Sequence, residues 1–84
     1  VMVSTPYIGV SPSDIENLVT TPLEKELGNV RDLKKMTSTS AEGVSLITLE
    51  FVPEVVIEDA LQRVRDAVGR AESDIPAEAE DTQI

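Results

Sequence analysis

Apolar residues recur along the chain with two periods, one typical of helices and one typical of strands. Residues 12–28 and 56–74 carry apolar side chains at helical spacing, whereas residues 1–5 and 33–52 are rich in strand-forming types. Helical spacing is seen in Ile15, Leu18, Val19, Leu23 and Leu27, and again in Ile57, Ala60, Leu61, Val64, Val68 and Ala71. The pattern predicts a strand over 1–5, a helix over 12–28, a hairpin over 33–52, a helix over 56–74 and an acidic tail over 75–84.

Proline and glycine residues mark the ends of these elements. Ser11 is a suitable N-cap for the first helix, with Pro12 at its first position. Pro22 lies inside that helix and lacks an N–H, so it predicts a kink just before it rather than an end, because the apolar stripe resumes in register. Gly28 then ends the helix, and Gly43 completes a tight turn between the two hairpin strands.

The order strand-helix-strand-strand-helix covers five of the six elements of a ferredoxin-like βαββαβ unit. Right-handed crossovers put both helices on one face of the sheet in such a unit, so we expect one α+β domain over residues 1–84. The last strand is missing or barely begun at Ile84. If it is absent, the first strand is left as an unpaired edge that invites dimerisation or strand exchange, and a swapped chain could supply the partner.

Alternation along the strands predicts which side chains occupy the face of the sheet without helices. These are Met2, Ser4, Lys35, Thr37, Thr39, Leu46 and Thr48. One interpretation is an ordinary solvated face, since antiparallel sheets often expose one side to water. The other is a contact with a ligand or another domain, because mixed aliphatic and hydroxyl groups suit amphiphilic molecules.

The second helix has a polar outward stripe formed by Glu58, Gln62, Arg65, Asp66 and Gly69. A solvated helix face is again the simplest interpretation. Gly69 is unusual, because glycine inside a helix costs roughly 0.5–1 kcal/mol relative to alanine and is best tolerated where another backbone approaches closely. It points to packing against a partner helix.

Composition excludes several classes of function. The net charge is −9 and the only aromatic residues are Tyr7 and Phe51, which argues against nucleic acid as a partner. The chain has no Cys and no His, its carboxylates lack EF-hand spacing, and its glycines form no phosphate-binding loop. No apolar stretch reaches the about 18 to 20 residues that cross a membrane. The sequence predicts a protein that is not an enzyme, with no catalytic residue, cofactor or metal.

Five segments together resemble one family. They are 7–12 (YIGVSP), 19–24 (VTTPLE), 36–43 (MTSTSAEG), 47–51 (ITLEF) and 60–66 (ALQRVRD). In order and spacing they resemble the resistance-nodulation-division (RND) multidrug efflux transporters of the AcrB-like, hydrophobe-amphiphile branch, at the first periplasmic porter subdomain (PN1). Two departures stand out, since Ile8 replaces the proline of the family's usual Tyr-Pro-Gly, and Glu54-Val55-Val56 replaces a Gly-Thr-Asp that would supply an N-cap.

The resemblance implies a trimeric pump of the bacterial inner membrane, in which proton entry drives export of amphiphilic small molecules. It places this subdomain in the periplasm, with the pump's remaining porter and transmembrane domains, a periplasmic adaptor and an outer-membrane channel as partners. Carried over by position, Ser4, Leu46 and Thr48 would border the substrate pathway, and Glu58, Gln62, Asp66 and Gly69 would face the pore on the trimer axis. The alternative is a free-standing ferredoxin-like module that senses small molecules or mediates interactions.

Overall fold

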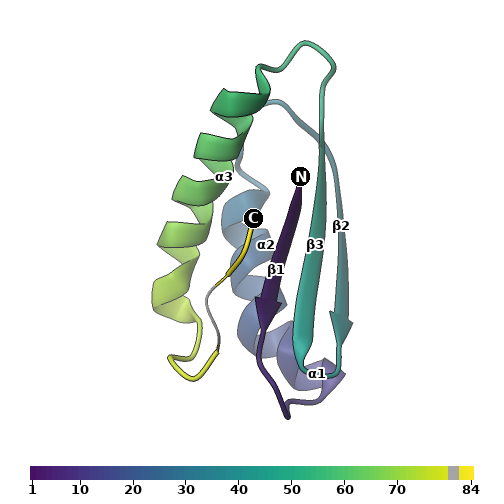
Figure 1. Ribbon diagram of the computed structural model, residues 1–84, viewed down its shortest axis with the longest axis vertical. Helices are drawn as coiled ribbons and strands as arrows, with labels where there is room; N and C mark the ends of the chain where they lie inside the picture. Colours follow the sequence, from purple (N-terminus) through teal and green to yellow (C-terminus); the bar gives the residue numbers. More distant parts are fainter. Residues whose placement is uncertain (80–81) are drawn as a thin grey trace.

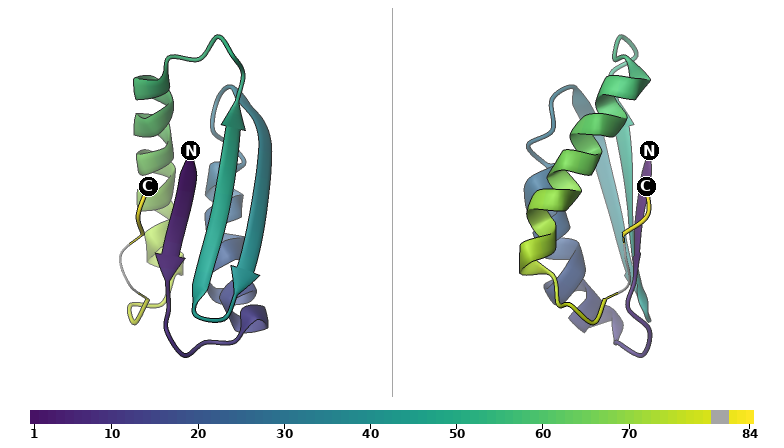
Figure 2. Two further views of the ribbon diagram at one scale, coloured as in Figure 1. Left: turned by 45° about the vertical axis from the view of Figure 1, so that its right-hand side comes forward. Right: turned by 60° about the vertical axis from the view of Figure 1, so that its left-hand side comes forward.

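The computed structural model describes residues 1–79 and 82–84, which form one helical layer against one antiparallel sheet (Figure 1). The strands are β1 (Met2–Pro6), β2 (Leu33–Ala41) and β3 (Val44–Phe51). The helices are α1 (Pro12–Ile15), the π-helical η1 (Glu16–Thr20), α2 (Thr21–Leu27), α3 (Ile57–Ala71) and the 3₁₀ turn η2 (Glu72–Asp74). All helices lie on one side of the sheet (Figure 2), so the predicted α+β architecture is confirmed.

The sheet has the strand order β1-β3-β2, with β3 antiparallel to both neighbours. The first strand and β2 are therefore parallel and separated by one strand, which is the split βαβ arrangement of ferredoxin-like folds. The hairpin turns at Glu42 and Gly43, where the glycine has a φ of +74° that few other residues adopt.

The C-terminal residues pair with the outer edge of β1. The N–H of Ser4 donates to the Gln83 carbonyl at 2.8 Å, and the N–H of Gln83 donates to the Ser4 carbonyl at 2.7 Å. The hydroxyls of Thr5 and Thr82 are joined by a hydrogen bond of 2.8 Å. The last strand is therefore begun at Gln83, and the condition for an unpaired β1 edge, its absence, is not met at Ser4.

A π-helical turn stands where a kink is predicted before Pro22. The N–H of Thr21 donates to the Glu16 carbonyl, five residues back, instead of the usual four. Pro22 has no N–H to continue the α-helical ladder, and the helix resumes its α-helical form through Leu27. At the N-terminus of α1 the N–H of Asp14 donates to the Ser11 hydroxyl at 3.4 Å, as the N-cap pattern predicts.

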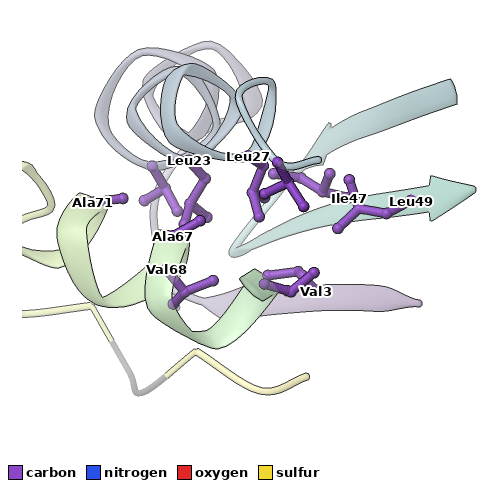
Figure 3. Close-up of a cluster of buried hydrophobic side chains, with 11 residues drawn as sticks. Val3, Leu23, Leu27, Ile47, Leu49, Ala67, Val68 and Ala71 are labelled. Carbon is purple, nitrogen blue, oxygen red and sulfur yellow. The ribbon is translucent and has the colours of Figure 1, made fainter. Parts of the chain in front are cut away.

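The hydrophobic core lies between the two layers (Figure 3). The sheet contributes Val3, Ile47 and Leu49, and the helices contribute Val19, Leu23, Leu27, Val64, Ala67, Val68 and Ala71. Ile47 is fully buried, whereas Leu46 and Thr48 beside it occupy the opposite face, as alternation along β3 predicts. Within residues 1–79 and 82–84, no helix combines the length and the apolar character that a membrane crossing requires.

Candidate functional site

The structure brings the three predicted pathway residues together on the helix-free face. The β-sheet register sets Leu46 of β3 directly between Ser4 of β1 and Thr39 of β2. Thr48, two residues further along β3, lies between Met2 and Thr37. Side chains at such paired positions are neighbours, with Cβ atoms about 4.5–5.5 Å apart. Ser4, Leu46 and Thr48 therefore belong to one continuous patch, which we call the helix-free patch.

The helix-free patch combines aliphatic and hydroxyl groups. Ser4 and Leu46 are half-buried and Thr48 is exposed, while Met2 is 55% exposed at one side of the patch. Toward the start of β2 the patch ends at a charged pair of positions, where Lys35 is the register partner of Glu50. Such a surface can offer dispersion contacts and hydrogen bonds to the same molecule. Among the described residues, no group of three or more His, Cys, Asp or Glu side chains is arranged to hold a metal ion.

The four residues predicted to face the trimer axis lie on one exposed side of α3, opposite its buried side. We call Glu58, Gln62, Asp66 and Gly69 the α3 stripe. The amide of Gln62 donates to the Asp66 carboxylate at 3.0 Å, which joins two neighbouring residues of the stripe. A Cβ added at Gly69 would meet no atom of residues 1–79 and 82–84 within 4 Å, so none of these residues requires glycine at that position.

The helix-free patch and the α3 stripe lie on opposite sides of the molecule. The patch belongs to the outer face of the sheet, whereas the stripe faces away from the sheet on the helical layer (Figure 2). One ligand cannot contact both surfaces of the same chain. They are therefore two separate candidate surfaces.

Two features escaped the sequence analysis. One is a buried hydroxyl cluster in which Thr20 contacts Ser45 at 2.6 Å and Ser40 at 2.9 Å. The other is a groove of about 410 Å³ between α3 and the α2–β2 loop. Its lining residues are Asn29, Val30, Arg31, Arg63, Asp66 and Arg70. The repeat of Arg63 and Arg70 seven residues apart signals a basic side of α3, but nothing local indicates that Arg31 joins it.

Comparison with known proteins identifies the class and then the family. The fold matches a solved structure of a heavy metal efflux pump, with a TM-score of 0.78 and 31% sequence identity over 80% of this chain. The matched region is 7% of the length of that pump. The sequence model of the AcrB/AcrD/AcrF family matches residues 1–84. The chain belongs to the AcrB/AcrD/AcrF family of RND efflux transporters.

Family membership confirms the resemblance found in the five sequence segments. It favours the efflux-transporter interpretation over the sensing module, because the family match extends over residues 1–84. The roles of the helix-free patch and the α3 stripe are separate questions, and they are taken up as proposals.

Proposed function

We propose that this chain forms part of the periplasmic substrate pathway of a proton-driven RND exporter in a bacterial inner membrane. The observation that carries the proposal is the helix-free patch, where Ser4, Leu46 and Thr48 lie side by side on adjacent strands. In this proposal the chain performs no chemistry of its own. It acts with the pump's other porter and transmembrane domains, in a homotrimer that meets an adaptor and an outer-membrane channel.

We propose amphiphilic organic compounds as the substrate class. The helix-free patch offers the aliphatic side chains of Leu46 and Met2 and the hydroxyls of Ser4 and Thr48, which suit a molecule with apolar and polar parts. A second candidate is a heavy metal cation, which the similarity to a heavy metal efflux pump favours. Soft metals prefer thiolate, thioether or imidazole ligands, and of these the patch supplies only the thioether of Met2.

Bulky substitutions in the helix-free patch test this proposal. In the transporter that contains this chain, Leu46→Trp and Thr48→Trp should change the minimum inhibitory concentrations of some amphiphilic compounds and leave others unaltered, because the added rings obstruct part of the pathway. Asn17→Trp, at an exposed position on the helical layer, is the matched control. Unaltered export of every compound would remove the patch from the pathway, and a change in metal tolerance alone would favour the metal cation.

We further propose that the α3 stripe faces its own copies around the three-fold axis of the trimer. Its support is the exposure of Glu58, Gln62, Asp66 and Gly69 on one side of α3. Gln62→Cys should form disulfide-linked dimers of the transporter under oxidation, whereas Asn17→Cys should not. The chain has no native cysteine, so this segment contributes no background. If Gln62→Cys stays unlinked in resting and in energised membranes, the axial position is wrong.

A further inference from the structure

The helix-free patch ends at a corner where a β-bulge brings two lysines to the same side of the sheet. The register between β2 and β3 shifts between Leu33 and Lys35, so β2 carries one extra residue there, Lys34. Such a bulge re-aims the side chains around it. Leu33 and Met36 both pack against the core although they are three residues apart. The two lysines between them are therefore both exposed on the outer side, and with Glu50 they form what we call the lysine corner.

The lysine corner has more positive than negative groups. Lys34 Nζ lies 3.9 Å from the Glu50 carboxylate, and the two side chains are 60% and 57% exposed, so water weakens their attraction. Lys35 makes no ion pair with any residue in the described ranges 1–79 and 82–84. Two ammonium groups against one carboxylate leave the corner with an excess of positive charge, whereas the chain as a whole has a net charge of −9.

The uncharged part of the helix-free patch continues from the lysine corner along β2 and β3. The register sets Thr37 beside Thr48, and then Thr39 beside Leu46. Side chains two residues apart on a strand are separated by about 7 Å, so the row of Thr39 and Leu46 lies roughly 13–14 Å from Lys35. A molecule that lies along the strands therefore meets a cation first, hydroxyl groups next and an aliphatic side chain last.

We propose that the lysine corner selects anionic amphiphiles, with a carboxylate or sulfate head group, from among the compounds that the helix-free patch admits. The ammonium of Lys35 binds the head group, Lys34 adds to the attraction, and the apolar part of the molecule lies on Leu46. Because the acidic chain repels anions at long range, the corner acts only at short distance, on molecules already in the pathway. This inference rests on the proposed function of the patch.

Detergents that share one alkyl chain and differ in head-group charge test the inference. The probes are dodecyl sulfate, dodecyltrimethylammonium and the uncharged dodecyl maltoside, and the measurement is their minimum inhibitory concentration in cells that depend on the transporter containing this chain. Lys35→Gln should lower the value for dodecyl sulfate roughly fourfold, as expected for loss of one exposed charge interaction. The value for dodecyl maltoside should stay unaltered, and that for dodecyltrimethylammonium should stay unaltered or rise.

Two further substitutions separate the lysine corner from the net charge of the chain. Lys25→Gln removes the same charge from an exposed position on α2, in the helical layer, and should leave all three values unaltered. Glu50→Gln removes the carboxylate of the corner and should act in the opposite direction, raising the value for dodecyl sulfate. All three side chains are exposed, and immunoblots will show that the variants reach the membrane in equal amounts.

Several results would overturn the inference. One is a transporter that confers no resistance to dodecyl sulfate, and another is a Lys35→Gln variant that lowers the values for the anionic and cationic detergents alike. Equal losses in Lys35→Gln and Lys25→Gln would reduce the effect to net charge.

The tryptophan substitutions in the helix-free patch distinguish this failure from failure of the proposed function. If Leu46→Trp alters export of amphiphiles while Lys35→Gln leaves resistance to dodecyl sulfate unaltered, only the selection by charge is wrong. If neither substitution has an effect on any detergent, the patch lies outside the pathway and both proposals are wrong.

Discussion

At the scale of single residues, the hydroxyl of Thr20 is a buried polar group with two side-chain partners. It is buried, and it contacts the hydroxyls of Ser45 at 2.6 Å and Ser40 at 2.9 Å. Ser40 and Ser45 are cross-strand partners on β2 and β3, so this single threonine joins the helical layer to both strands of the hairpin. Buried polar groups are costly when they lose their partners, which makes the cluster a point of high sensitivity.

Thr20→Val should therefore destabilise the chain by about 1–3 kcal/mol, since it keeps the shape of the side chain but leaves the Ser45 hydroxyl without its partner. Thr37→Val is the same chemical change on the exposed helix-free face and should alter the free energy of unfolding by less than about 0.5 kcal/mol. Urea denaturation of both variants measures the difference. Equal effects would mean that the hydroxyl cluster contributes no stability.

Two glycines should respond to alanine in opposite directions. Gly43→Ala places a Cβ on a residue with a φ of +74°, and the resulting backbone strain should destabilise the chain by about 1–2 kcal/mol. A steric clash adds nothing to this cost, because the atom nearest to the added Cβ is 3.5 Å away. Gly69→Ala adds a Cβ in open space within a helix and should stabilise by about 0.5–1 kcal/mol. Thermal or urea unfolding of the two variants checks both signs, and a destabilising Gly69→Ala would show that this position is constrained within the chain itself.

At the scale of elements, β3 shows how far alternation alone determines a strand. Its period of two separates Ile47 and Leu49, which are buried, from Leu46 and Thr48 on the other face. In the helical segment from α1 to α2, by contrast, the apolar pattern alone does not determine the local structure. Its apolar stripe predicts helix throughout, but the π-turn over Glu16–Thr20 depends on how Pro22 and the packing of Val19 and Thr20 are accommodated together.

The two faces of β3 should differ in their response to truncation. Ile47→Ala should cost about 2–5 kcal/mol because it leaves a cavity in the core, a large part of the total stability of so small a domain. Leu46→Ala removes a similar side chain from the half-buried opposite face and should cost about 1 kcal/mol or less. Denaturant midpoints compare the two, and a larger loss for Leu46→Ala would contradict the assignment of the faces.

At the scale of the whole molecule, the sheet depends on its C-terminal residues to protect β1. The pair between Ser4 and Gln83 and the hydrogen bond between Thr5 and Thr82 hold the tail against the outer side of that strand. An exposed strand edge is a template for pairing with another chain. We therefore expect the tail to limit pairing of β1 with a second chain.

A chain that ends at residue 81 should lose protection of the Ser4 amide against hydrogen exchange, because that N–H donates to Gln83. The amide of Leu49, which donates to the Val1 carbonyl on the inner side of β1, should keep most of its protection. The shortened chain should also self-associate more at high concentration, as light scattering would show. An unaltered exchange rate at Ser4 would mean that the pairing with Gln83 is not formed in solution.

The candidate surfaces were predictable to different extents. Alternation placed Ser4, Leu46 and Thr48 on one face, but only the register showed that Ser4 and Leu46 are direct neighbours. Helical spacing placed Glu58, Gln62 and Asp66 on one side of α3, and their role at a trimer axis stays a prediction. The arginine-lined groove was missed, because Arg31 reaches α3 only through the fold of the α2–β2 loop.

The sequence by itself determined the type and order of the elements, the buried face of each and the family, because these follow from local periodicity and from motifs read in order. Only the tertiary structure decided which distant residues meet. Thr20 with Ser45, Ser4 with Gln83 and Arg31 with the arginines of α3 are all such pairings. Each depends on strand register, on a loop path or on the π-turn, and these are set by the packing of the whole core rather than by neighbours along the chain.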